Sequence, residues 1–211
     1  MNSNSNFQKK IYERWRGYPF DPDLKAINIR YEKMRKYIEE EGKGKTILDL
    51  GCADGSLLEP LTRDHTVHGV EISESLSEAA KKRGLLVTTA DVEQEGIPFP
   101  SETFDVVVAG EILEHIVETD FFLTECNRVL KPGGKLVLAV PNINTFFSPF
   151  LMFLFDYPPP LAARYQSEHI RDFTFSTLRI ALESNGLTIE KKRGTLFYIP
   201  VFPNSFLKLR S

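Results

Sequence analysis

The stretch from residue 46 to residue 58 constrains the fold of this chain more than any other. A short apolar run ends at the acid Asp49, passes through small residues between Gly51 and Gly55, and resumes as an apolar segment at helical spacing. This pattern predicts a buried strand, a tight turn and the start of a helix. In an open α/β sheet, a nucleotide binds at such a turn. Glycine lets the backbone approach a ligand closely, because no Cβ is in the way.

A second apolar run, at residues 67–70, ends in another acid, Glu71. It follows the turn at the distance expected for the next parallel strand. An acid at the tip of that strand can accept hydrogen bonds from both hydroxyls of a ribose. The turn and Glu71 together predict a site for an adenosine-type cofactor.

The turn does not fit the usual sites for dinucleotides or triphosphates. A dinucleotide fingerprint needs glycine at 51, 53 and 56, whereas the chain has Gly51, Ala53 and Ser56. The chain has no Gly-x-x-x-x-Gly-Lys, which excludes a P-loop. Asp54 and Glu59 lie near the expected helix terminus, and acids there suit a cationic sulfonium better than a pyrophosphate.

The alternative spacing, Asp-x-Gly-x-Gly-x-Gly, is met at Asp49, Gly51 and Gly55, and Ala53 is the one departure. This turn resembles the first motif of the class I S-adenosylmethionine-dependent methyltransferases of types 11 and 23. The phrase LKPGGKLVLAVPN, which begins at residue 130, is typical of the same enzymes. The resemblance covers roughly residues 28 to 190, and its motifs come in the family's order.

The resemblance implies an α/β, Rossmann-like, doubly wound and mostly parallel seven-stranded sheet. Further strands are expected at 85–90, 104–109 and 136–140, and helices at 24–41 and 177–186. Strands near 187–190 and 196–201 would supply an antiparallel C-terminal hairpin strand. We divide the chain into an N-terminal helical segment (1–41), a cofactor-binding core (42–141), an inserted aromatic cap (142–176) and a C-terminal part of the same domain (177–211).

The expected cofactor is S-adenosyl-L-methionine, with S-adenosyl-L-homocysteine as the product. In the family, Asp91 would contact the adenine amino group and Val92 the ring. Arg30 lies in a segment similar to one that holds the cofactor carboxylate in ubiquinone-pathway methyltransferases, although a surface helix charge is the alternative interpretation. The predicted cofactor residues are Asp49, Gly51, Cys52, Ala53, Gly55, Glu71, Ile72, Asp91, Val92, Gly110 and Arg30.

Methyl transfer from a sulfonium is an in-line displacement, so the protein mainly aligns the acceptor and excludes water. A general base is needed only when the acceptor arrives protonated. The histidines placed for this role are His115, after the fourth strand, and His169, after the cap. We therefore predict both as catalytic residues.

Glu111, Glu114 and His115 form a Glu-x-x-Glu-His pattern. It resembles a stretch of the ubiquinone-biosynthesis O-methyltransferases and of small-RNA 2′-O-methyltransferases, in which these residues are associated with a divalent cation. The Mg²⁺ or Mn²⁺ interpretation stays open beside a second one, in which the acids cap a helix N-terminus. We assign no metal ligand from the sequence.

The aromatic segment 146–157 follows the fifth strand, at the edge of the sheet where ligands bind. We expect it to cover an acceptor pocket; the alternatives are core packing and a homodimer or membrane-surface contact. Its apolar run, 150–155, is too short to span a bilayer. The predicted acceptor is a small, partly apolar or aromatic molecule methylated at oxygen.

Three other functions compete with this one. The same chemistry could act on a nitrogen, carbon, lipid or saccharide acceptor, or the chain could bind the cofactor as a regulatory protein without turnover. An NAD-dependent oxidoreductase is disfavoured by Ala53 and Ser56. A net charge of -3 argues against a dedicated nucleic-acid partner. Two cysteines give no disulfide framework and, with a polar N-terminus that lacks a signal-peptide pattern, predict a cytoplasmic protein.

Overall fold

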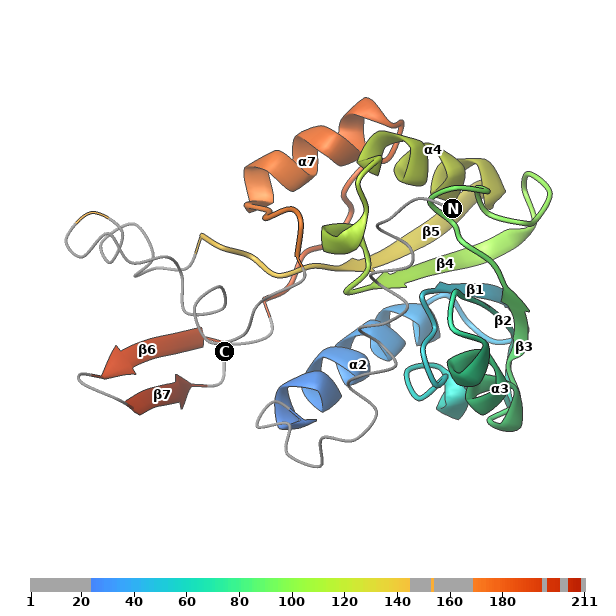
Figure 1. Cartoon of the computed structure of the whole chain (residues 1–211), viewed down its shortest axis with the longest axis horizontal. Coiled ribbons are helices and arrows are strands. Elements are labelled where there is room, and N and C mark those ends of the chain that lie inside the picture. The colour runs from blue at the N-terminus through green and yellow to red at the C-terminus, as the bar shows by residue number, and fades with distance from the viewer. Residues whose placement is uncertain (1–23, 145–152, 154–168, 195–196, 202–204, 210–211) are drawn as a thin grey trace.

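The computed structural model describes residues 24–144, 153, 169–194, 197–201 and 205–209 (Figure 1). The predicted aromatic segment 146–157 lies outside the described residues except at Phe153, and so does most of the expected cap, 142–176. The division of the chain into four parts stays a prediction.

The centre of the fold is a parallel sheet of five strands in the order β3-β2-β1-β4-β5 (Figure 1). The order reverses between β1 and β4, and ligands bind at such a point outside the carboxyl ends of the strands. A Rossmann-like α/β architecture is thereby confirmed. The strands are β1 Thr46–Leu50, β2 Thr66–Glu71, β3 Leu86–Thr89, β4 Phe104–Gly110 and β5 Leu130–Ala139.

Helices cover both faces of the sheet. Figure 1 shows α2 and α3 on one face and α4 and α7 on the other. The helical segments are α2 Leu24–Glu39, α3 Glu74–Lys82, α4 Thr119–Val129, α7 Phe175–Ser184 and the short 3-10 helices η2 Glu59–Leu61 and η3 Leu113–His115. None of the helices that the structure describes is long and apolar enough to cross a membrane.

Successive residues of each central strand point to opposite faces and enter two separate cores. Val107 packs with Leu113, Phe122 and other residues on the α4 face. Its neighbour Val106 packs with Met34 and other residues on the α2 face. Because both faces are covered, the strand is apolar without interruption, as expected for a parallel sheet.

Two local expectations differ from the structure. The segment after the first turn is not a regular helix: it forms turns and the 3-10 helix η2, with Pro60 in its first positions. Proline has no N–H to donate to the preceding turn of an α-helix. The fifth strand begins earlier than predicted, since Leu130 pairs with Phe104 before the register shifts at the predicted Pro-Gly turn and Lys135 pairs with Val106.

The C-terminal part also departs from the expected arrangement. The strand predicted near 187–190 is wrong, because these residues form no strand. Strands β6 Phe197–Val201 and β7 Ser205–Leu209 pair antiparallel in a two-stranded sheet of their own. Within the described residues the main sheet therefore has five strands, and the predicted seven-stranded sheet is not confirmed.

Candidate active site

The turn after β1 is fixed by backbone bonds to β2. The amides of Gly51 and Cys52 both donate to the carbonyl of Val70, at 2.9 and 3.2 Å. Gly51 has a φ of 67°, and a Cβ there would lie 3.0 Å from the side chain of Ile112. Left-handed backbone and close packing thus both require glycine at 51. Gly55 is constrained in the same way, with a φ of 82°.

Glu71 ties this turn to the end of β2. Its side chain is buried, one carboxylate oxygen accepts from Ala53 N at 2.9 Å, and the other accepts from Ser73 N at 2.9 Å. Burial raises the pKa of Glu71, although these N–H bonds oppose the shift. Each carboxylate oxygen keeps a further lone pair, so both can still accept a hydroxyl.

A hollow of about 90 Å³ lies at the carboxyl ends of β1, β2, β3 and β4. It brings together residues that are distant in the sequence. The predicted residues that line it are Gly51, Glu71, Ile72, Asp91, Val92 and His115, together with Glu111. The other predicted cofactor residues of β1, its turn and β4 do not line it: Asp49, Cys52, Ala53, Gly55 and Gly110.

These other residues support the turn from within the protein. Asp49 is 2% exposed, and its Oδ2 has no hydrogen-bond partner among the described residues. Burial, followed by the negative charge of Glu71, raises the pKa of Asp49 to about 8. Cys52 is buried against Gly69, where an added Cβ would meet its Sγ at 2.6 Å. A Cβ on Gly110 would lie 3.2 Å from the end of Met34.

Asp91 organises the loop after β3. Its Oδ1 accepts from the amides of Glu93 and Gln94, at 3.0 and 3.3 Å, and its Oδ2 accepts from the Gln94 side chain at 2.7 Å. The carboxylate lines the hollow while it caps this loop. Its contact with adenine stays a prediction.

Tyr31, on α2, lies close to Asp49 and Asp54, a placement that the sequence reasoning missed. Burial, followed by the negative charges of Asp49 and Asp54, raises the pKa of this phenol. The phenol is therefore near enough to the acids of β1 and its turn for their charges to act on it. The available signal was its place on the apolar face of α2, but that spacing predicts core packing and not a polar contact.

Arg30 precedes Tyr31 and points to the end of β4. Its Nη1 donates to Glu111 Oε2 at 2.9 Å, and each side chain is 28% exposed. Arg30 is therefore a partly buried partner in an ion pair, and its contact with a cofactor carboxylate stays a prediction. Glu111 has a φ of 58°, and its amide donates to Ala139 O at 2.9 Å. Burial raises the pKa of Glu111, whereas the charges of Arg30 and His169 lower it.

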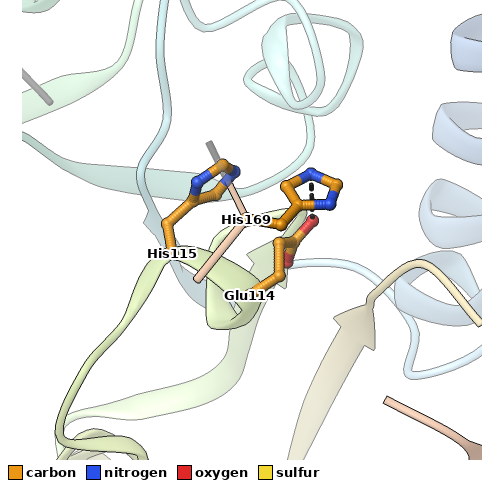
Figure 2. A group of neighbouring side chains, drawn as sticks. All are labelled: Glu114, His115 and His169. Atoms are coloured by element: carbon orange, nitrogen blue, oxygen red, sulfur yellow. Dashed lines mark ion pairs between the residues drawn. The ribbon is translucent and has the colours of Figure 1, made fainter. Parts of the chain in front are cut away.

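Glu114, His115 and His169 form a close group (Figure 2), in which one ligand atom of each lies within 4.8 Å of the others. The ring centroids of the two histidines are 5.0 Å apart, and His169 Nε2 is 3.9 Å from Glu114 Oε1. The two residues after His169 hold it there, because Ile170 N donates to Glu114 O at 3.1 Å and the Arg171 side chain donates through Nη2 to Val117 O at 2.9 Å.

Glu114 is the least satisfied member of this group. It is 1% exposed, and neither carboxylate oxygen has a hydrogen-bond partner in another described residue. Burial, and then the charge of Glu111, raises the pKa of Glu114 to about 8. Glu114 lies in the first turn of η3 and not at the start of α4, which begins at Thr119, so a capping role for it concerns η3 only.

Ala53 marks the departure from the glycine motif, and its φ is 47°. A left-handed backbone costs an L-residue other than glycine about 1–2 kcal/mol. Glycine avoids this cost, but it loses more backbone entropy on folding than alanine does, so only part of the difference remains. We expect Ala53→Gly to stabilise the fold by roughly 0.5–1 kcal/mol. Thermal melting checks this, with Ala80→Gly, inside the regular helix α3, as a control that should destabilise. A lower melting temperature for Ala53→Gly would show that the strain is not real.

Comparisons with known proteins agree with this geometry. Residues 48–138 match the family described as "Methyltransferase domain". The ubiquinone biosynthesis O-methyltransferase of Rhizobium leguminosarum bv. trifolii is 30% identical over 74% of this chain and 64% of its own length. The mitochondrial ubiquinone biosynthesis O-methyltransferase of Homo sapiens is 32% identical over 83% of this chain and 51% of its own length.

Solved structures show the same fold. A SAM-dependent methyltransferase from Aquifex aeolicus superposes with a TM-score of 0.58 at 22% identity, over 90% of this chain and 92% of that one. A second, from Archaeoglobus fulgidus, gives 0.59 at 20% identity, over 85% and 74%. The chain spans between 42% and 64% of the length of the curated relatives that it matches. By motif, fold and relatives, the chain belongs to the class I S-adenosylmethionine-dependent methyltransferases.

Proposed function

We propose that the chain transfers a methyl group from S-adenosylmethionine to an oxygen of a small, partly apolar or aromatic acceptor. The observation that carries the proposal is the hollow at the switch point of the sheet. There Glu71 offers two buried carboxylate oxygens and Gly51 offers close backbone approach, and His115 stands at the same hollow. The O-methyltransferase names of the relatives favour oxygen as the acceptor atom.

The neighbouring cleft provides room for an acceptor. It has a volume of about 1420 Å³ and runs along α2, β5 and α7. Arg30, Glu111 and His169 line it, together with the aromatic rings of Tyr37, Phe173 and Phe175. A phenolic acceptor would find aromatic walls there and His169, whose ring lies 5.0 Å from that of His115 in the cofactor hollow.

In this arrangement the protein aligns the acceptor oxygen with the methyl group and removes its proton. His115 lines the cofactor hollow and His169 lines the cleft, so each is a candidate general base. A positioned base contributes about 10²–10⁴-fold to the rate when the acceptor arrives protonated.

The test is methyl transfer from labelled S-adenosylmethionine to a panel of phenols, catechols, amines and sugars, with product mass as the readout. We expect a phenolic or catecholic product. The variant His115→Gln should lower kcat by about 10²–10⁴-fold for an ordinary phenol and much less for an acidic phenol that is already ionised. Methylation at nitrogen or carbon would replace the oxygen assignment, and tight binding without transfer would favour a regulatory cofactor-binding protein.

A specific observation favours a divalent cation as part of this site. A buried carboxylate without hydrogen bonds costs free energy unless a positive charge meets it, and neither oxygen of Glu114 has a hydrogen bond to another described residue. Carboxylate oxygens suit Mg²⁺ or Mn²⁺, whereas imidazole nitrogens suit transition-metal ions, so Glu114, His115 and His169 fit Mn²⁺ better than Mg²⁺. Such an ion would supply a positive charge that orients acceptor oxygens and lowers their pKa.

We expect chelation with EDTA to abolish transfer to catechols, and Mg²⁺ or Mn²⁺ to restore it. Glu114→Gln should lose the response to the ion and should melt at a higher temperature than the wild type in EDTA at pH 9, because no buried charge remains. Glu118→Gln, at the exposed start of α4, is the matched control. Full activity after exhaustive chelation would remove the cation from the proposal and leave the histidines as bases.

A further inference from the structure

Glu111 lies at the boundary between the two cavities of the site. It lines the small hollow with Gly51 and Glu71, and it also lines the wide cleft with Arg30 and His169. The ion pair of Arg30 with Glu111, at 2.9 Å, therefore stands where the cofactor hollow meets the cleft. If either side chain changed its partner, the charges that line both cavities would be rearranged.

Arg30 has donors left over in this pair. Only its Nη1 bonds to Glu111, and its Nε is buried without a hydrogen-bond partner among the described residues. A buried unsatisfied donor is unfavourable, and the guanidinium fork matches a carboxylate with two parallel bonds. Glu111 also lines the cofactor hollow, so the unused donors of Arg30 stand beside that hollow, where a carboxylate of a bound ligand can meet them.

Glu111 is held away from a neighbouring cluster of possible cation ligands, to which its carboxylate could be added. The ligand atoms of Glu114, His115 and His169 gather within 4.8 Å, and that group does not include Glu111. Glu111 instead bonds to Arg30 from a left-handed backbone with a φ of 58°. A non-glycine residue holds such a conformation only when its surroundings enforce it.

We propose that Arg30 exchanges partners when cofactor binds. Without cofactor it holds Glu111; with cofactor it binds the carboxylate of the cofactor's amino-acid part and releases Glu111 toward the cation group of Glu114, His115 and His169. This inference rests on the proposed function, which supplies the cation site. It makes Arg30 a positioning residue through which cofactor and cation strengthen each other's binding by the same factor.

The experiment measures Mn²⁺ affinity by electron paramagnetic resonance on the full chain, without added ligand and with saturating S-adenosylhomocysteine. In the wild type we expect S-adenosylhomocysteine to tighten Mn²⁺ binding about tenfold, within the usual range of coupling between sites. Methylthioadenosine, which lacks the amino-acid part, should leave Mn²⁺ affinity unchanged. Benzoate should also leave it unchanged, which separates a cofactor carboxylate from an acceptor carboxylate.

Variants test the exchange itself. Arg30→Gln should bind Mn²⁺ about tenfold more tightly than the wild type even without S-adenosylhomocysteine, because Glu111 is already released. Glu111→Gln should bind Mn²⁺ weakly with and without the ligand. Lys36→Gln removes an exposed positive charge from the same helix and should behave like the wild type. Circular dichroism of each variant checks that it folds.

The outcomes separate the two proposals. No Mn²⁺ binding by the folded wild type under any condition overturns the cation site and this inference with it. Mn²⁺ binding that is equal with and without S-adenosylhomocysteine, or unchanged in Arg30→Gln, overturns the exchange and leaves the cation site intact. Equal tightening by methylthioadenosine or by benzoate overturns the role of the cofactor carboxylate.

Discussion

Glu71→Ala is expected to weaken the binding of S-adenosylhomocysteine at least tenfold. Two hydrogen bonds from ribose hydroxyls to a carboxylate are lost, and each such bond contributes roughly 1.5–3 kcal/mol. A loss of about 1.4 kcal/mol already lowers affinity tenfold. The structure adds a second effect, because the same carboxylate accepts the amides of Ala53 and Ser73. The variant therefore also loses support for the turn after β1.

Isothermal calorimetry measures the affinity, and thermal melting measures the support of the turn. Glu71→Gln keeps the size and one acceptor oxygen, so it should lose less in both measurements than Glu71→Ala. Glu74→Ala removes an exposed carboxylate three positions further along, in the first turn of α3, and should leave the affinity unchanged. Unaltered S-adenosylhomocysteine affinity in Glu71→Ala would take this residue out of the cofactor site.

The sequence was sufficient to predict the parallel core. The strands at β1 and β4 are buried on both faces, so their apolar runs are continuous and easily read, with Val106, Val107 and Val108 all fully buried. The acids at the ends of β1 and β2 could be placed for the same reason. In a parallel sheet the carboxyl ends of the strands meet at one edge, and Glu71 lies there beside Gly51 as expected.

The contacts made by helix α2 could not be predicted. Arg30 and Glu111 are 81 positions apart, and their pairing depends on how α2 crosses the end of β4. Tyr31, the next residue of α2, comes near Asp49 and Asp54 for the same reason. A periodic apolar face shows which side of a helix is buried, but it does not show which polar side chains of other elements the helix will contact.

In the C-terminal part, the sequence pattern predicted a strand that the structure does not form. Residues 187–190 alternate between apolar and polar side chains, as a half-buried strand would. In the structure, Leu187 N bonds back to Leu182 O at the end of α7, and Glu190 makes an ion pair with Lys135 of β5. An extended segment can bury alternate side chains through such contacts without pairing with a strand. The periodicity of the sequence therefore cannot distinguish a paired strand from an unpaired extended segment.

Asp49→Asn is expected to change how stability depends on pH. In the folded protein burial, and then the charge of Glu71, raises the pKa of Asp49 to about 8, above its ordinary value of 3.8. The folded state therefore holds a proton that the unfolded state has released, and stability falls as pH rises between these values. Each pKa unit corresponds to about 1.4 kcal/mol, so the loss above pH 8 amounts to several kcal/mol.

Melting at pH 5 and pH 9 checks this, without cofactor. Asparagine cannot ionise, so the variant should melt close to the wild type at pH 5 and well above it at pH 9. Asp105→Asn is the matched control in β4. Burial raises the pKa of Asp105, but hydrogen bonds from Thr46 N and Lys131 outweigh this and lower it. The carboxylate is therefore ionised at both pH values and contributes the same free energy to stability at each. That variant should lose the same stability at each.

The same measurement links Asp49 to the cofactor. Bound S-adenosylmethionine carries a sulfonium and an ammonium, and nearby positive charge favours the ionised carboxyl. Saturating cofactor should therefore reduce the pH dependence of the wild type and leave that of Asp49→Asn unchanged. If the wild type and Asp49→Asn differ by the same melting temperature at pH 5 and pH 9, then Asp49 is ionised throughout and its buried oxygen must have a partner that the fold supplies.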